Sequence, residues 1–276
     1  MEKIHWTNNK SYDHNLITDR IKFVEKNMNG LLPLYGREKE KLITYAENNN
    51  IPTEELMSIR NQVKIQKEIK ASRFLSQMQP IVKKNFVNLV SNQLLESNPP
   101  KKFVGSQILS FIKKSKLPLP IIFKIITPMT EFKLLDKNTF YYYYFNLIIK
   151  IIRQKELTSR KISQEFEDDL AAYLKKNYPH DFYTENDIKA QKLHHITPDI
   201  LFKEPVQLEV NGKIYTIRWI DAKNYILINT PFMLTSLKKQ AEKYNNAFGM
   251  GAFVFHYGFD SSIKIPGVIM LDGSFL

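Results

Sequence analysis

Two aspartates and a lysine lie in short segments that could meet on one sheet. Asp199 ends the tripeptide Thr197-Pro198-Asp199, and Asp221 and Lys223 both lie in Trp219-Ile220-Asp221-Ala222-Lys223. Side chains two residues apart on a strand point to the same side, about 7 Å apart by the rise of the chain. Asp221 and Lys223 can therefore share one site, and Asp199 adds a second carboxylate if it begins the neighbouring strand.

Two carboxylates beside an ammonium group suit metal-dependent hydrolysis of a phosphodiester. Mg²⁺ and Mn²⁺ prefer hard oxygen ligands, and the peptide carbonyl of Ala222 can add a third. A divalent ion polarises the phosphate and lowers the pKa of a bound water, while Lys223 stabilises charge on the phosphate. Such short motifs also arise by chance, and the alternative reading is a strand-end turn beside a surface ion pair.

The segments around these residues predict an α/β or α+β domain. Val206 to Val210 and Lys213 to Ile217 flank Asn211-Gly212, a pair that supplies the positive φ angles of a type I′ hairpin turn. A helix is expected from Pro231 to about Asn246, with proline in its first turn. Strands are expected at 251–257 and 264–271. Alternation predicts that one face of the second hairpin strand carries Tyr215, Ile217, Trp219, Asp221 and Lys223.

Further polar residues lie on the two helices expected to flank this sheet. A helix over 161–176 has an apolar arc, with Glu167 at one edge of it and Asp169 at the other. On the helix after the hairpin, Gln240 and Tyr244 lie one turn apart on one face. Without further context, a polar helix residue and a partly buried tyrosine explain this last pair better than a functional role does.

The N-terminal half is mainly helical and strongly basic. Residues 1–150 hold 24 Lys and Arg against 13 Asp and Glu, whereas residues 151–276 hold 16 against 15. Helices are predicted over 37–48, from Thr53 to about 75, and over 139–153. The second of these would present Arg60, Lys64 and Lys67 on one face, as in a helix-turn-helix unit. The charge indicates a polyanion, with nucleic acid favoured over an anionic membrane surface or a merely solvated basic face.

Composition excludes several other classes of protein. The absence of cysteine rules out disulfides, zinc–thiolate sites and cysteine nucleophiles, and it fits an intracellular protein. The N-terminus has no apolar signal core. The longest apolar run, 140–152, is too short and too polar to span a bilayer, which favours a buried helix over an interfacial one.

Taken together, these motifs resemble the PD-(D/E)XK nuclease superfamily, which has the restriction-endonuclease-like fold. More narrowly, the chain is similar to the nuclease family that binds codanin. The resemblance covers about 160–260 and rests on these residues: Thr197-Pro198-Asp199, Trp219 to Lys223, Gln240 with Tyr244, Asn246-Ala247-Phe248-Gly249-Met250-Gly251, and His256-Tyr257-Gly258-Phe259.

The resemblance implies a Mg²⁺- or Mn²⁺-dependent deoxyribonuclease with a basic helical region at 1–155 and a nuclease domain at 156–276. Asp199, Asp221 and the Ala222 carbonyl would bind the metal, Glu167 would complete the acidic cluster, and Lys223 would be the catalytic lysine. Gln240 and Tyr244 would lie near the substrate phosphate. In a eukaryote, the resemblance further implies a nuclear location and a codanin-like partner.

The chain departs from this family pattern at two places. Ala222 stands where serine is expected, a change that keeps the carbonyl ligand. Asn224-Tyr225-Ile226 replaces a stretch like Phe-Gly-Asp, which bears on substrate preference. A catalytically inactive protein of the same fold, which binds nucleic acid and recruits a partner, is the alternative.

Overall fold

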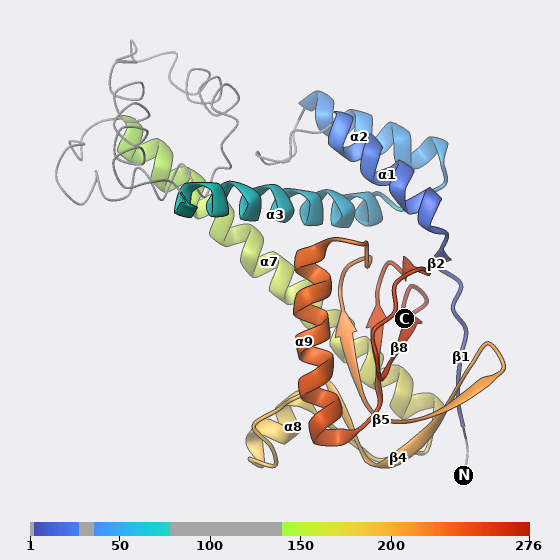
Figure 1. Ribbon diagram of the computed structural model, residues 1–276. Helices are drawn as coiled ribbons and strands as arrows, with labels where there is room; N and C mark the ends of the chain where they lie inside the picture. The colour runs from blue at the N-terminus through green and yellow to red at the C-terminus, as the bar shows by residue number, and fades with distance from the viewer. Residues whose placement is uncertain (1–2, 28–35, 78–139) are drawn as a thin grey trace. The chain divides into compact units, whose positions relative to one another are not determined.

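The computed structural model describes residues 3–27, 36–77 and 140–276 of the chain (Figure 1). The chain forms two compact units. One unit, called here the sheet unit, comprises 1–26, 42–62 and 158–276, and the other comprises 27–41 and 63–157. The sheet unit contains every strand of the described residues, together with the predicted site.

A mixed six-stranded sheet is the centre of the sheet unit. Its strands are β1 (Ile4–Trp6), β3 (Phe182–Thr184), β4 (Ile200–Val210), β5 (Lys213–Lys223), β6 (Gly251–Phe255) and β8 (Val268–Asp272). The order is β1-β4-β5-β6-β8, and β3 also pairs with β4. The β4–β5 hairpin and the β3–β4 pair are antiparallel, and the other pairs are parallel. The prediction of an α/β protein is thus confirmed.

The described helices are α1 (His14–Asn27), α2 (Gly36–Asn48), α3 (Thr53–Gln77), α7 (Phe140–Asn177), α8 (Glu185–Ala190) and α9 (Pro231–Phe248). The helices predicted over 37–48, from Thr53 onward and after Thr230 are confirmed. The separate helices predicted over 139–153 and 161–176 are wrong, because α7 is continuous. The connecting residues 154–160 contain neither glycine nor proline, so nothing there ends a helix.

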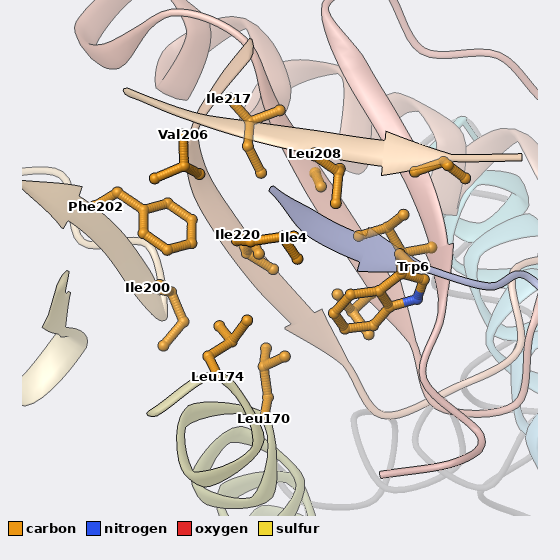
Figure 2. Packing of buried hydrophobic residues seen from close by; sticks show 14 of the residues in the cluster. Ile4, Trp6, Leu170, Leu174, Ile200, Phe202, Val206, Leu208, Ile217 and Ile220 are labelled. Atoms are coloured by element: carbon orange, nitrogen blue, oxygen red, sulfur yellow. The ribbon is translucent and has the colours of Figure 1, made fainter. Parts of the chain in front are cut away.

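Two apolar layers cover the two faces of the sheet. On one face, Leu170 and Leu174 of α7 point toward Ile200, Phe202 and Ile220 of the strands (Figure 2). The other face packs against α9 through a second cluster that includes Trp219, Phe253, Leu237 and Ala241. Burying both faces explains why β6 is apolar at every position.

Strand β5 does not keep one alternation along its length. Tyr215 and Ile217 pack in the α7 layer, whereas Trp219 packs in the α9 layer. The β4–β5 register shifts between Leu201 and Val206, opposite this point. The prediction that Tyr215, Ile217, Trp219, Asp221 and Lys223 share one face is therefore wrong for the first two, because β5 changes faces between Ile217 and Trp219, where its pairing with β4 is irregular.

The glycine motif after α9 has a structural reason. Gly249 ends α9 with a φ of 86°, and its carbonyl accepts a hydrogen bond from the Trp219 indole at 2.9 Å. Gly251 pairs with Trp219 across β5 and β6, and a Cβ at Gly251 would lie 2.1 Å from the indole ring. Only glycine allows this close approach. The Phe-Gly-x-Gly segment therefore fixes Trp219, two residues before Asp221.

The N-terminal residues form part of the sheet unit. β1 pairs in parallel with β4, and β2 (Ser11–Tyr12) pairs in parallel with β7 (Phe259–Asp260). The Trp6 indole donates to the Asp272 carbonyl at 2.8 Å. Neither strand was predicted, because two or three residues carry no periodic signal. The predicted boundary at 155 lies within α7.

Two further predictions concern the basic N-terminal half and helices that could span a membrane. Eight of the thirteen basic residues between 60 and 124 lie outside the described residues, as does the segment 97–102, where Pro99 and Pro100 predict a turn. Among the helices that are described, none has both the length and the apolar character needed to cross a bilayer.

Candidate active site

The predicted pair of aspartates meets where β4 begins and β5 ends. The register that pairs Ile200 with Ile220 brings Asp199 opposite Asp221, one position further along. The Asp199 Oδ2 atom accepts a hydrogen bond from the Ala222 N–H at 2.6 Å. The ammonium group of Lys223 lies 2.6 Å from Asp221 Oδ1. The expected proximity of these residues is therefore present.

Helix α9 contributes a chain of hydrogen bonds to the same point. The Gln240 amide donates to Asp221 Oδ2 at 2.8 Å and to the Tyr244 hydroxyl at 3.0 Å. The Tyr244 hydroxyl in turn donates to the Thr197 carbonyl at 3.3 Å. Gln240 and Tyr244 therefore join the segment before Asp199 to the carboxylate of Asp221. This arrangement makes a role as isolated surface residues untenable for the pair.

Glu167, rather than Asp169, faces the site from α7. Glu167 and Asp199 line one cleft of about 340 Å³, together with residues from the start of α8. Asp169 is exposed and is not part of this lining. Helix phase explains this difference in position, because residues two apart on a helix lie on different sides.

Glu185 is a fourth carboxylate at the site, and the sequence did not predict it. It lines the same cleft, and its Oε1 atom accepts from the Thr197 hydroxyl at 3.0 Å. Lys189 pairs with its other oxygen at 2.7 Å. Thr184 and Asp187 form a capping box that starts α8 and holds Glu185 in the first turn. That Thr-x-x-Asp spacing was the available signal for a helix beginning here.

Burial and crowding perturb the protonation of these acids. Burial, followed by the charges of Asp221 and Glu167, raises the pKa of Asp199 from 3.8 to about 9. Burial also raises the pKa of Glu167, with further contributions from Glu185 and Asp221. The pKa of Tyr244 is raised by burial and then by the charge of Asp221. The site therefore holds more carboxyl groups than Lys223 can neutralise, and Asp199 retains its proton near neutral pH.

These crowded carboxyl groups, which can release protons when a cation binds, fit a divalent cation. The donors available are the carboxylates of Asp199, Asp221 and Glu167 and the carbonyl of Ala222, all hard oxygens. Within residues 3–27, 36–77 and 140–276, however, no three acidic or histidine side chains already surround a point as a metal-binding group. Asp221 is instead directed at Lys223 and Gln240.

The predicted basic face of α3 is only partly exposed. Arg60 is 3% exposed, so its side chain is buried and does not join a surface. Lys64 and Lys67 are partly exposed, and Lys64 pairs with Glu68 at 3.6 Å. The expectation that all three residues share one accessible face is wrong for Arg60. Arg60 follows the buried Ile59 and precedes the buried Gln62 and Val63, so this turn of α3 is buried on more than one side.

Comparison with known proteins identifies relatives of unknown function. A family model described as "Protein of unknown function TPD sequence-motif" matches residues 142–274, which include the chain's Thr197-Pro198-Asp199. The "Uncharacterized protein L539" of Acanthamoeba polyphaga mimivirus is 41% identical over 282 residues, covering 99% of this chain and 96% of the viral protein. No solved structure matches the chain.

Proposed function

We propose that this chain, which matches the TPD sequence-motif model over residues 142–274, is a metal-dependent nuclease that hydrolyses phosphodiester bonds in DNA. The chain and the mimivirus protein belong to one family. The observation that carries the proposal is the meeting of Asp199, Asp221 and Lys223 at the adjoining ends of β4 and β5. Sheet order and flanking helices suit a restriction-endonuclease-like fold, which is part of the proposal.

Asp199, Asp221, Glu167 and the Ala222 carbonyl would hold Mg²⁺ or Mn²⁺. When bound, the ion would polarise the scissile phosphate and lower the pKa of the attacking water. The raised pKa of Asp199 supports this assignment. Its causes are burial and the neighbouring carboxylates, and a bound cation would offset both by favouring the ionised form.

The remaining residues have roles that follow from their bonds. The Lys223 ammonium group would stabilise charge that develops on the phosphate oxygens. Gln240 orients Asp221, and Tyr244 orients Gln240 while holding the Thr197 carbonyl. Both α9 residues therefore position the carboxylate of Asp221 from the side opposite α7.

The basic N-terminal half would grip the DNA backbone. Lys64 and Lys67 are the described candidates for phosphate contacts, and much of the remaining positive charge falls between 83 and 124. Phosphate contacts of this kind supply sequence-independent affinity. A nuclear location and a codanin-like partner, in a eukaryotic source, complete the proposal.

The direct experiment compares the wild-type protein with Asp221→Ala on labelled single-stranded, double-stranded and branched DNA. Cleavage by the wild type with Mg²⁺ or Mn²⁺, abolished by EDTA and by Asp221→Ala, is the expected result. DNA affinity measured without a metal should stay within about twofold, because Asp221 is buried and contributes no phosphate contact.

A second candidate is a catalytically inactive protein that binds nucleic acid and recruits a partner. It is favoured by one observation, namely that no three carboxylates in the described part of the chain are already arranged as ligands. DNA binding by the wild type without cleavage of any DNA form, in either metal, would select this candidate.

A further inference from the structure

The segment that follows Lys223 is held by side chains from the N-terminal part of the sheet unit. The Ile226 N–H donates to the Ser58 hydroxyl at 3.0 Å, and the Ile226 carbonyl accepts from the Gln62 amide. Ile226 is fully buried, and Ser58 and Gln62 are 7% and 4% exposed. Both backbone polar groups of one residue therefore end on α3, which is 168 and 164 residues away in the sequence.

Ser58 and Gln62 are suited to act as a pair. They lie four residues apart on α3, so they project from the same face of the helix. The Gln62 Oε1 atom is buried and has no hydrogen-bond partner among the described residues. A buried unpaired oxygen destabilises the fold. An apolar residue would therefore be favoured at position 62 if the amide were not needed as a donor to Ile226.

The two hydrogen bonds at Ile226 hold a backbone segment that follows Lys223 by three residues. The Lys223 carbonyl accepts from the Tyr225 N–H at 2.7 Å and from the His256 N–H at 3.0 Å. The Leu227 N–H donates to the Gly258 carbonyl at 3.0 Å. Between these two anchors, Ile226 is attached to α3. A shift of this segment would move the Lys223 ammonium away from Asp221, which it now meets at 2.6 Å.

We propose that Ser58 and Gln62 are positioning residues that hold residues 224–228 and thereby set Lys223 for phosphodiester hydrolysis. This inference rests on the proposed nuclease function. It gives α3 a role in the chemical step, in addition to DNA binding. It also gives a structural role to Asn224-Tyr225-Ile226, the stretch in which the chain departs from the family pattern.

The experiment measures single-turnover DNA cleavage, DNA affinity and amide hydrogen exchange in Ser58→Ala and Gln62→Leu. Each variant should cleave about 10- to 100-fold more slowly, because small displacements of a catalytic group have effects of this size. DNA affinity should not change, and exchange should accelerate at 224–228 only. Ser58→Thr, which keeps the hydroxyl, should retain the wild-type rate.

Asn8→Leu is the matched control. Asn8 donates to the Met270 carbonyl at 3.1 Å and accepts from the Asp272 N–H at 2.8 Å, so its loss also removes bonds from a side chain to two backbone groups. These groups lie on β8, so the cleavage rate should be preserved when the melting temperature falls.

The outcomes separate the positioning role from the nuclease function. If Ser58→Ala and Gln62→Leu cleave DNA as fast as Asn8→Leu and the wild type, the positioning role is overturned and the nuclease function stands. If the wild type cleaves no DNA, the nuclease function fails, and the exchange measurement alone decides whether α3 holds this segment. If the amide hydrogen exchange of residues 224–228 is the same in both α3 variants as in the wild type, Ser58 and Gln62 do not hold this segment.

Discussion

The β4–β5 hairpin has two ends of opposite character. At the turn, Asn211 and Gly212 adopt φ angles of 49° and 75°, and Ile214 is half exposed. At the other end, Asp221 is 3% exposed among other carboxylates. The turn end satisfies local backbone preferences and is open to solvent. The site end collects carboxyl groups that repel one another when they are ionised. This crowding lowers the stability of the fold and is useful only if a cation or substrate binds there.

Lys223→Met should separate chemistry from binding at the site end. Methionine keeps the length and the apolar contacts of the side chain but removes the ammonium group, so cleavage should fall roughly 100- to 1000-fold. Metal affinity should not fall, because a positive charge beside the ligands opposes cation binding, and DNA affinity should be kept because it comes mainly from phosphate contacts outside the site. Cleavage assays with calorimetric titration of Mn²⁺ would check this, and a rate within threefold of the wild type would remove Lys223 from the reaction.

Asp199→Asn should stabilise the metal-free protein. The folded pKa of Asp199, about 9, is above its unfolded value of 3.8, so the folded state retains a proton that the unfolded state releases. Folding is favoured most below pH 3.8, and this contribution is lost as the pH rises from 3.8 toward 9. Asparagine removes the penalty, and the expected gain at pH 7 is about 2–4 kcal/mol.

Thermal melts of wild type and Asp199→Asn from pH 5 to 9, in EDTA, would test the sign. The wild-type melting temperature should fall more steeply with pH than that of the variant. Added Mn²⁺ should narrow the difference by stabilising only the wild type. Parallel curves of melting temperature against pH in EDTA would show that the ionisation of Asp199 does not destabilise the folded protein.

Gly212→Ala should change stability slightly and function not at all. A Cβ at Gly212 would meet no atom within 4 Å, so the only penalty is the positive φ of 75°, about 1 kcal/mol. Gly251→Ala is the contrasting variant, because its Cβ would meet the Trp219 ring at the site end and should destabilise by about 1–3 kcal/mol. Urea unfolding would rank the two, and equal values would contradict the contrast between the ends.

Lys64→Gln combined with Lys67→Gln should have the smallest effect. Removing two phosphate contacts should reduce the slope of log affinity against log salt by about 1–2. Arg60 is left unchanged because it is buried. Affinity measurements between 50 and 200 mM salt would show this change, and an unaltered slope would exclude this part of α3 from the DNA interface.

The features that the sequence predicted correctly are those with local causes. The Asn211-Gly212 turn, the Pro231 start and Gly249 end of α9, and the spacing of Asp221 and Lys223 each depend on a few neighbouring residues. Chain alternation and strand order were enough to bring Asp199 and Asp221 together.

The missed features depend on contacts between distant segments. Sequence spacing does not relate the segments that meet in these features. They are the pairing of β1 with β4, the burial of Arg60, the change of face in β5 at the register shift, and the approach of Glu185 to Thr197. Local propensity gives no information about such contacts, because tertiary packing determines them.

A crystal structure after a Mn²⁺ soak, with anomalous scattering, would show whether Asp199 and Asp221 hold a divalent cation. We expect one anomalous peak between the carboxylates of Asp199 and Asp221, within bonding distance of the Ala222 carbonyl, and no peak there in Asp221→Ala. A saturating soak that leaves this position empty, or a strong peak elsewhere, would contradict it.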